Sequence, residues 1–215
     1  MKWGLFGGTF DPIHTGHLRA AEELAETLGL DAVIFIPAAL PPHKTDRDIT
    51  PFEHRLAMTR LAVEGNDRFS VSDIEARREG KSYSIDTVRH FLGEDNRRPE
   101  LFFITGQDAF NAITTWRDWK MLLDLCHFAV MTRPGYSNGG LHRILPDEVA
   151  AAHAWDEKRE GFVNPQGKGI FFRKTTFMDI SASDIRKRVA SGRSIRYLTP
   201  DPVVRYIEVR RLYEK

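Results

Sequence analysis

Short apolar runs that end near glycine or proline alternate in this chain with longer segments whose apolar residues recur at helical spacing. We expect strands over residues 2–6, 32–36, 69–74, 101–105, 127–132 and 170–172. We expect helices over residues 16–28, 52–64, 84–92, 147–158, 184–190 and 202–212, with a broken helix over 109–125. Ser183 and Asp201 are the expected caps of the last two helices. Strands that alternate with helices predict an α/β fold, a doubly wound parallel sheet in a three-layer α/β/α arrangement.

Length and charge limit the classes of protein that fit. The 215 residues carry 31 Lys and Arg against 30 Asp and Glu, so the formal net charge is +1. We expect a single domain over residues 1–215, with a small helical part from about residue 182. The charge balance gives no general case for a nucleic-acid partner, and the longest apolar run, residues 32–40, is too short to cross a membrane. The single cysteine, Cys126, excludes an intrachain disulfide and favours a cytoplasmic location.

The strongest chemical signal is the string GGTFDPIHTGH at residues 7–17, which joins the first strand to the first helix. Gly7 and Gly8 let the backbone approach a ligand closely. Free N–H groups and the dipole at the start of the helix favour a phosphate, and His14 and His17 can both face that point. If only the two glycines were present, a tight turn with two surface histidines would be a sufficient interpretation. The two histidines could also bind a metal ion, but no further ligand follows at a recognisable spacing. The full string favours a phosphate site.

This string resembles the signature of the nucleotidyltransferases that share an HxGH motif. Its His-Thr-Gly-His segment is also similar to the ATP motif of class I aminoacyl-tRNA synthetases. Four further segments narrow the resemblance to bacterial nicotinate-nucleotide adenylyltransferases, which act in NAD synthesis. They are PPHK at 41–44, SYSIDT at 82–87, GQD at 106–108 with Trp116 after it, and ISASDIR at 180–186. The resemblance runs from Trp3 to about Tyr206 and implies a Rossmann-like nucleotidyltransferase fold.

The resemblance also implies an activity and a set of site residues. The reaction would transfer AMP from ATP to nicotinate mononucleotide and release pyrophosphate. The implied catalytic residues are His14, His17, Lys44 and Arg186. The implied ATP contacts are Gly7, Gly8, Thr9, Phe10, Gly16, Gly106, Asp108, Ile180, Ser181 and Ser183. The implied mononucleotide contacts are Ser84, Trp116 and Arg117.

Within these sets, the resemblance gives individual roles. His17 and Ser183 would contact the transferring phosphates, while Arg186 and the helix start near residue 183 would hold the β- and γ-phosphates. Asp108 would accept a hydrogen bond from the adenosine ribose, and backbone amides near Ser84 and Arg117 would bind the nicotinate carboxylate. Residue 182 is alanine where the family usually has serine, so a hydroxyl contact is lost there.

Elementary chemistry agrees with this reaction. A phosphate nucleophile is already anionic near neutral pH, because its second pKa is about 6, so no general base is needed. Mg²⁺ is expected to bridge the ATP phosphates and keep much of its water, so we predict no separate metal site in the protein. The pyridinium ring of the mononucleotide is a cation that the indole face of Trp116 can attract. We therefore expect ATP and nicotinate mononucleotide as partners, and a homodimer is compatible with the sequence.

Several alternatives stay open at this point. Lys44 and Arg186 are also compatible with solvated charges, Asp108 with a helix cap, and Trp116 with the core. The same chemistry could act on nicotinamide mononucleotide or phosphopantetheine. A nucleotide sensor without turnover and a tRNA synthetase fragment are further alternatives, although the chain lacks the Lys-Met-Ser-Lys-Ser loop of those synthetases.

Overall fold

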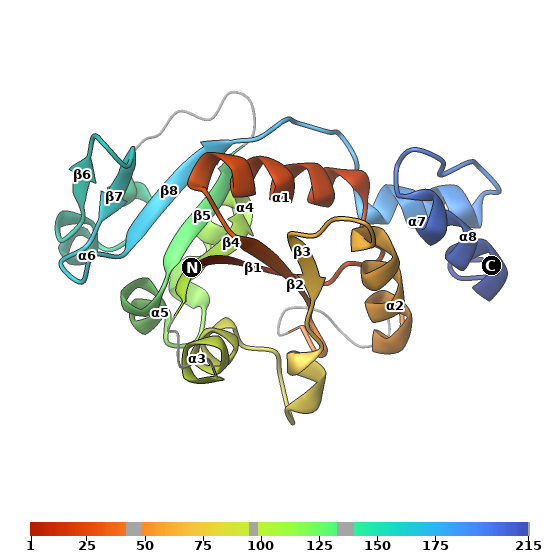
Figure 1. Ribbon diagram of the computed structural model, residues 1–215, viewed down its shortest axis with the longest axis horizontal. Helices are drawn as coiled ribbons and strands as arrows, with labels where there is room; N and C mark the ends of the chain where they lie inside the picture. Colours follow the sequence, from red (N-terminus) through yellow and green to blue (C-terminus); the bar gives the residue numbers. More distant parts are fainter. Residues whose placement is uncertain (42–48, 95–98, 133–139, 215) are drawn as a thin grey trace.

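An eight-stranded sheet forms the centre of the computed structural model, which describes residues 1–41, 49–94, 99–132 and 140–214 (Figure 1). The strands are β1 (Lys2–Gly8), β2 (Ala32–Pro37), β3 (Phe69–Val71), β4 (Glu100–Gly106), β5 (His127–Thr132), β6 (Ala154–Asp156), β7 (Gly161–Val163) and β8 (Gly169–Lys174). Their order across the sheet is β3-β2-β1-β4-β5-β8-β7-β6. The pairs from β3 to β8 are parallel, and β7 and β6 add an antiparallel edge.

Helices cover both faces of this sheet. They are α1 (Thr15–Leu28), α2 (Phe52–Val63), α3 (Ser84–Glu94), α4 (Gln107–Asn111), α5 (Trp119–Leu125), α6 (Asp147–Ala151), α7 (Ala182–Ala190) and α8 (Asp201–Arg210). Leu5 and Phe6, neighbours in β1, belong to two different buried clusters, so the clusters lie on opposite faces. One cluster joins the sheet to α1, α2, α7 and α8, and the other joins it to α3, α4 and α5. The predicted α/β fold in three layers is confirmed.

The strand order reverses beside β1. The chain passes from β1 to β2 on one side of it and later places β4 on its other side. Open α/β sheets bind ligands beside the carboxyl ends of their strands at such a point. Two connections meet there: residues 9–14 lead from β1 into α1, and Gly106 leads from β4 into α4.

The prediction of a helix over residues 147–158 is wrong in its second half. The helix ends at Ala151, and the chain continues as the antiparallel pair β6 and β7. Trp155 and Phe162 face each other across this pair, with ring centroids 5.1 Å apart. Cross-strand aromatic pairs stabilise antiparallel strands, and this pairing overrides the helical spacing of the local sequence.

Three other predicted boundaries also differ. The broken helix over 109–125 consists of α4, a 3₁₀ turn at Ile113–Thr115 and α5. Strand β3 ends at Val71 and is followed by a 3₁₀ turn at Ile74–Arg77. The predicted caps are wrong as well, because α7 is capped by Ser181, whose extended backbone suits that position, and Pro200 precedes α8.

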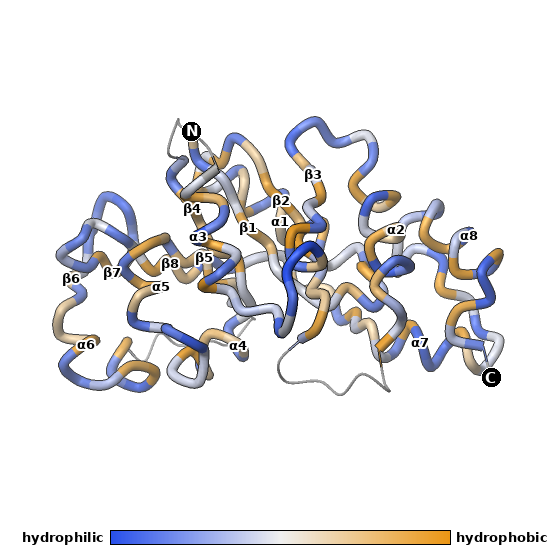
Figure 2. The backbone as a smooth tube through the Cα atoms, turned by 90° about the horizontal axis from the view of Figure 1, so that it is seen from below, coloured by the Kyte–Doolittle hydropathy of each residue, from blue (hydrophilic) through white to orange (hydrophobic). Residues whose placement is uncertain are grey.

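Helices α7 and α8 lie beside α2 at one end of the molecule, and β6 and β7 lie at the other end (Figures 1 and 2). Ile185 of α7 and Val203 of α8 are fully buried in the same cluster as Met58 of α2. The C-terminal helical part therefore shares the core of the sheet domain.

Two sequence expectations concern single features. Cys126 is buried as predicted, and burial raises the pKa of its thiol to about 12. Within the described residues, no helix combines the length and apolar character needed to cross a bilayer.

Candidate active site

A cavity of about 180 Å³ opens beside the carboxyl ends of β1, β4 and β5. Two of the predicted catalytic residues, His14 and His17, line it, together with three of the predicted ATP contacts, Gly16, Gly106 and Asp108. The sequence did not point to the rest of its wall, which includes Met131, Thr132, Thr176, Phe177 and Met178. We call it the histidine cavity. It occupies the position where a doubly wound sheet binds its ligands.

His14 and His17 form a stacked pair in this cavity. Their ring centroids lie 3.6 Å apart, with 25° between the ring planes. The backbone N–H of His14 donates to Nδ1 of His17 at 3.2 Å, so a neutral His17 carries its proton on Nε2. The rings of Phe6 and Phe10 pack edge-on against His17 and fix its orientation. His17 therefore offers one N–H donor from an immobilised ring.

Burial keeps both imidazoles neutral near pH 7. It lowers the pKa of His14 to about 4. Burial, and then the neighbouring His14, lower the pKa of His17 well below its ordinary value. Nδ1 of His14 is buried and has no hydrogen-bond partner among the residues that the structure describes. A bound anion would raise both pKa values, so these histidines would bind it more strongly as they gain protons.

Steric contacts explain two glycines of the string at residues 7–17. A Cβ atom on Gly8 would lie 2.9 Å from the Phe10 ring, and one on Gly16 would lie 3.1 Å from Nδ1 of His14. At Gly7 the nearest atom is 3.7 Å away, which is an ordinary contact. The protein's own rings therefore leave no room for a Cβ at Gly8 and crowd one at Gly16, whereas the expected close approach of a ligand at Gly7 stays a prediction.

Helix α7 brings a second predicted segment to this region. Oγ of Ser181 accepts a hydrogen bond from the Asp184 backbone at 3.1 Å and lies 3.1 Å from Oγ of Ser183. One turn later, Nη1 of Arg186 donates to the carbonyl of Asp11 at 2.6 Å. Arg186 therefore links α7 to the loop after β1 and is not a freely solvated arginine.

The predicted ATP contacts are distributed unevenly over this region. Asp108 lies in the first turn of α4, whose N-cap is Gly106, so Asp108 is not the cap of that helix. The Phe10 side chain is buried against His17, and the Thr9 carbonyl accepts a hydrogen bond from Arg55. Several predicted ATP contacts lie outside the wall of the histidine cavity: Gly7, Gly8, Thr9, Phe10, Ile180, Ser181 and Ser183.

A second cavity, of about 370 Å³, contains all three predicted mononucleotide contacts, Ser84, Trp116 and Arg117. We call it the aromatic cavity. Trp116 packs edge-on against Phe103 with centroids 5.7 Å apart and is only half-buried, so it serves the core and the cavity together. The guanidinium of Arg117 lies 4.9 Å from the centroid of Tyr83, which also lines the cavity. Helix α4 contributes to both cavities, through Asp108 to the first and Ala109 to the second.

Lys44 lies outside the described residues, and Arg55 contacts described residues on both sides of it in the sequence. The side chain of Arg55 is 1% exposed, and its guanidinium donates to the carbonyls of Thr9, Ala38 and Thr50 at 2.7–2.8 Å. Sequence reasoning missed Arg55, because an arginine in an amphipathic helix is usually solvated. Asp11 was missed too, although it belongs to the string at residues 7–17.

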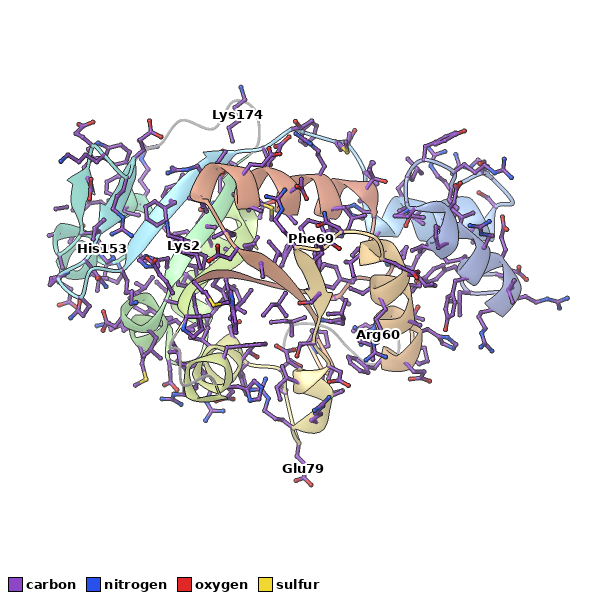
Figure 3. The ribbon with its side chains drawn as sticks, in the orientation of Figure 1. Lys2, Arg60, Phe69, Glu79, His153 and Lys174 are labelled. Carbon is purple, nitrogen blue, oxygen red and sulfur yellow. The ribbon has the colours of Figure 1, made fainter. Side chains whose placement is uncertain are left out.

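A third cavity, at the other end of α1, also contains cations. Lys2 lies there, near the C-terminal end of α1 (Figure 3), together with Arg159 and Arg173. Their side chains donate to backbone carbonyls, for example from Arg173 to Glu160 at 2.8 Å. The predicted motifs contribute no residue to it, so the histidine and aromatic cavities are the stronger candidates.

Comparison with known proteins agrees with this geometry. The sequence profile of the cytidylyltransferase-like family matches residues 5–188. A protein of Geobacter sp. strain M21, named "Probable nicotinate-nucleotide adenylyltransferase", is 45% identical over 213 residues, which are 99% of this chain and 98% of that protein. A protein of Geobacter sulfurreducens with the same name is 44% identical with the same coverage.

Solved structures show the same fold. The nicotinic acid mononucleotide adenylyltransferase of Plasmodium falciparum, complexed with NaAD, superposes with a TM-score of 0.71 at 18% identity. The match covers 99% of this chain and 97% of that one. The family profile and the full-length relatives together show that this chain belongs to the nicotinate-nucleotide adenylyltransferases of the cytidylyltransferase-like family.

Proposed function

We propose that the protein transfers AMP from ATP to nicotinate mononucleotide, which yields nicotinate adenine dinucleotide and pyrophosphate in NAD biosynthesis. The observation that carries this proposal is the pair of cavities that α4 helps to line. One contains the buried His14 and the half-buried His17 at the start of α1, and the other contains a half-buried tryptophan with Ser84 and Arg117. Two sites of different chemistry that share one short helix suit two nucleotides that must react end to end.

In the reaction, a phosphate oxygen of the mononucleotide attacks the α-phosphorus of ATP. The bond from the α-phosphorus to the bridging oxygen breaks, and its electron pair leaves with pyrophosphate. Because the attacking phosphate is already anionic, the protein has to hold two polyanions in line and stabilise the charge that builds up. Nε2–H of His17 is a suitable donor for that charge, since its ring is fixed by Phe6, Phe10 and His14.

The β- and γ-phosphates are assigned to the other side of the loop after β1. Arg186 is anchored there by the Asp11 carbonyl and retains further N–H donors. Ser183 and the first turn of α7 lie on the same helix, and Lys44 follows the end of β2. We assign the ribose of ATP to Asp108, which lines the histidine cavity.

The aromatic cavity is the proposed acceptor site. The pyridinium ring would stack on the face of Trp116, while the backbone near Ser84 and Arg117 would donate to the nicotinate carboxylate. An amide in place of the carboxylate would bring its own NH₂ group toward those donors. This supports nicotinate mononucleotide over nicotinamide mononucleotide as the preferred acceptor.

Mg²⁺ is proposed to arrive with ATP. Nucleotidyltransferases of this kind generally use Mg²⁺ with ATP. In the described part of the chain, no group of three or more His, Cys, Asp or Glu side chains is placed to hold a metal ion. The histidine cavity instead offers imidazole and hydroxyl groups around the phosphates, which suits an ion that keeps several water ligands. When bound, the ion would neutralise phosphate charge, and the residues named above would orient the substrates.

The remaining parts of the proposal concern the setting of the enzyme. We propose that it acts in the cytoplasm on small nucleotides, without a nucleic-acid partner, as a homodimer. Light scattering at several concentrations would measure the oligomeric state.

One assay tests the central proposal. Purified protein is incubated with ATP and Mg²⁺ and, in separate reactions, with nicotinate mononucleotide, nicotinamide mononucleotide or phosphopantetheine, and the products are identified by mass. Pyrophosphate should appear only with ATP, Mg²⁺ and a pyridine mononucleotide together. Turnover of phosphopantetheine alone would move the protein to another acceptor class, and no turnover with any acceptor would support a nucleotide sensor.

A further inference from the structure

Asp11 connects four distant parts of the chain at the edge of the candidate site. Its side chain is 3% exposed, and its carboxylate lies beside Thr50, Tyr213 and Arg186. Oδ2 accepts a hydrogen bond from the backbone of Thr50 at 3.3 Å, and Oδ1 accepts one from the hydroxyl of Tyr213 at 2.7 Å. The backbone carbonyl of Asp11 accepts from Arg186 at 2.6 Å. Asp11 therefore joins the loop after β1 to the start of α2, to α7 and to the C-terminal residues.

The donor from Tyr213 is a fixed feature of this junction. Tyr213 follows α8, and its ring packs against the buried cluster that contains Met58. Burial, and then the Asp11 carboxylate, raise the pKa of the Tyr213 hydroxyl, so it remains protonated and donates. A hydrogen bond from a hydroxyl to a carboxylate is of the strong, charge-assisted kind. The carboxylate of Asp11 is thus oriented by a residue 202 positions away.

Arg186 stands close to the same carboxylate without forming a tight ion pair with it. Its Nη1 lies 3.9 Å from Oδ2 of Asp11, well beyond hydrogen-bond distance, while the same nitrogen donates to the Asp11 carbonyl. Its side chain is 34% exposed, so part of the guanidinium is available to a ligand. A shift of the carboxylate toward Arg186 would convert this arrangement into a direct ion pair.

We propose that Tyr213 is a positioning residue: its hydroxyl holds the Asp11 carboxylate away from Arg186 and so keeps that guanidinium available for the ATP phosphates. The inference rests on the proposed function in one respect, namely the assignment of the β- and γ-phosphates to Arg186. Without the hydroxyl, Oδ1 of Asp11 would be buried and unpaired, and the nearby guanidinium is a donor that could satisfy it. Asp11 and the phosphates would then compete for the same arginine.

The test compares two tyrosines of the C-terminal part. Tyr213→Phe removes the hydroxyl that binds Asp11 and keeps the ring. Tyr206→Phe is the matched control, because the Tyr206 hydroxyl lies 2.9 Å from Nδ1 of His54 and joins α8 to α2 away from Asp11. Each variant loses one hydrogen bond of a tyrosine hydroxyl, to Asp11 in one case and to His54 in the other. Thermal melts should therefore show similar, modest destabilisation. Only Tyr213→Phe should raise the Kd and KM for ATP, by about three- to tenfold, the scale of one hydrogen bond to a charged group. Its kcat should stay within about twofold of wild type at saturating ATP.

A double-mutant cycle separates this role from general loosening. In an Arg186→Ala background, Tyr213→Phe should change the Kd for ATP by less than about 1.5-fold, because the arginine that Asp11 could capture is gone. The inference is overturned if Tyr213→Phe binds ATP like Tyr206→Phe, or if it weakens ATP equally in both backgrounds. ATP binding is measured by calorimetry as well as by turnover. If the wild-type protein lacks adenylyltransferase activity, the proposed function fails, while the binding comparison still decides the role of Tyr213.

Discussion

The histidine cavity and the aromatic cavity share α4 but are built on different principles. The first lies at the reversal of strand order, and its two histidines come from one short loop and the start of α1, three residues apart in the sequence. The second lies between the start of α3 and the turn before α5, and its chemistry comes from the ring of Trp116 and from backbone groups. Under the proposed function, the first cavity would hold phosphate charge and the second a flat ring.

The two cavities also differ in how tightly their key rings are held. His17 is held by a backbone hydrogen bond and by three aromatic rings, so a small loss there should affect the reacting phosphate. Trp116 packs edge-on against one aromatic ring, that of Phe103, so a smaller aromatic ring at this position should keep part of the stacking on the acceptor. Substitutions in the first cavity should therefore act on kcat or on ATP, and substitutions in the second should act on the acceptor.

The largest effect is expected for His17→Ala. The variant loses a donor for the charge that develops on the transferring phosphate, so kcat should fall by about 10²–10³, the scale of one lost transition-state donor. The KM for either substrate should change much less. His142→Ala is the control, because His142 is exposed, pairs with Asp147 and lines neither cavity. Steady-state kinetics with both substrates varied make the measurement, and near-normal kcat in His17→Ala would make His17 a bystander.

The second prediction uses the neutral state of His14. Its pKa is about 4 in the folded protein and about 6.5 when unfolded, so between these values the unfolded chain binds a proton that the folded chain does not. Stability should therefore be complete above about pH 6.5 and should decrease as the pH falls toward 4. At pH 5 the loss from His14 is about 2 kcal/mol relative to pH 7.

Thermal and urea melts of His14→Asn at pH 7 and pH 5 check this prediction. The difference in unfolding free energy between the two pH values should be smaller in the variant than in the wild type. His127 also contributes to the pH dependence of the wild type, since burial lowers its pKa to about 4 and its ring lies 2.8 Å from Glu100. Both proteins keep His127, so the difference between them reports on the substitution at His14. An unchanged pH dependence in His14→Asn would show that His14 is already charged or exposed in the free protein.

The sequence predicted the histidine cavity better than its surroundings, and the reason is locality. Residues 7–17 hold their own geometry, because Gly8 makes room for Phe10 and the His14 backbone bonds to the His17 ring. The strand at residues 127–132 was also predicted correctly, because parallel strands that are buried on both faces are continuously apolar in sequence. In these places the local pattern and the fold agree.

The contacts that the sequence did not predict join residues far apart. Nothing near Tyr213 in the chain indicates that its hydroxyl binds Asp11, and nothing near Arg55 indicates that its charge is fully buried among carbonyls. The edge pair β6 and β7 was missed for a related reason, since its stability comes from Trp155 packing on Phe162 across the pair. Such contacts depend on topology, which a single sequence shows only through known motifs.

The third prediction is Arg186→Lys. Lysine keeps the charge but lacks the planar fork that binds phosphate oxygens in pairs, so ATP binding should weaken by about 1–2 kcal/mol. Arg188→Lys is the matched control on the same helix, because Arg188 pairs with Asp184 at 2.7 Å instead of with the loop after β1. Calorimetry with ATP measures the difference. If the two variants bind ATP with equal affinity, Arg186 does not contact the ATP phosphates, whatever happens to kcat.

The smallest effect is expected for Trp116→Phe, and it separates the aromatic cavity from the histidine cavity most cleanly. A smaller π face attracts the pyridinium less, by about 0.5–1 kcal/mol, so the KM for nicotinate mononucleotide should rise about two- to sixfold. The KM for ATP should not change, because Trp116 does not line the histidine cavity. Both the acid and the amide acceptor carry a cationic ring, so both should weaken by similar factors and the preference for nicotinate should survive.

Trp119→Phe controls for loss of core packing, since Trp119 packs against the same buried cluster without lining the aromatic cavity. Melting temperatures of both variants are measured beside the KM values for ATP and for the two acceptors. If Trp116 were only a core residue, its replacement would lower the melting temperature like that of Trp119 and leave every KM unchanged. A rise in acceptor KM in Trp116→Phe alone, with similar melting temperatures, would instead assign the acceptor ring to this cavity, because only the face that Trp116 presents there differs between the two variants.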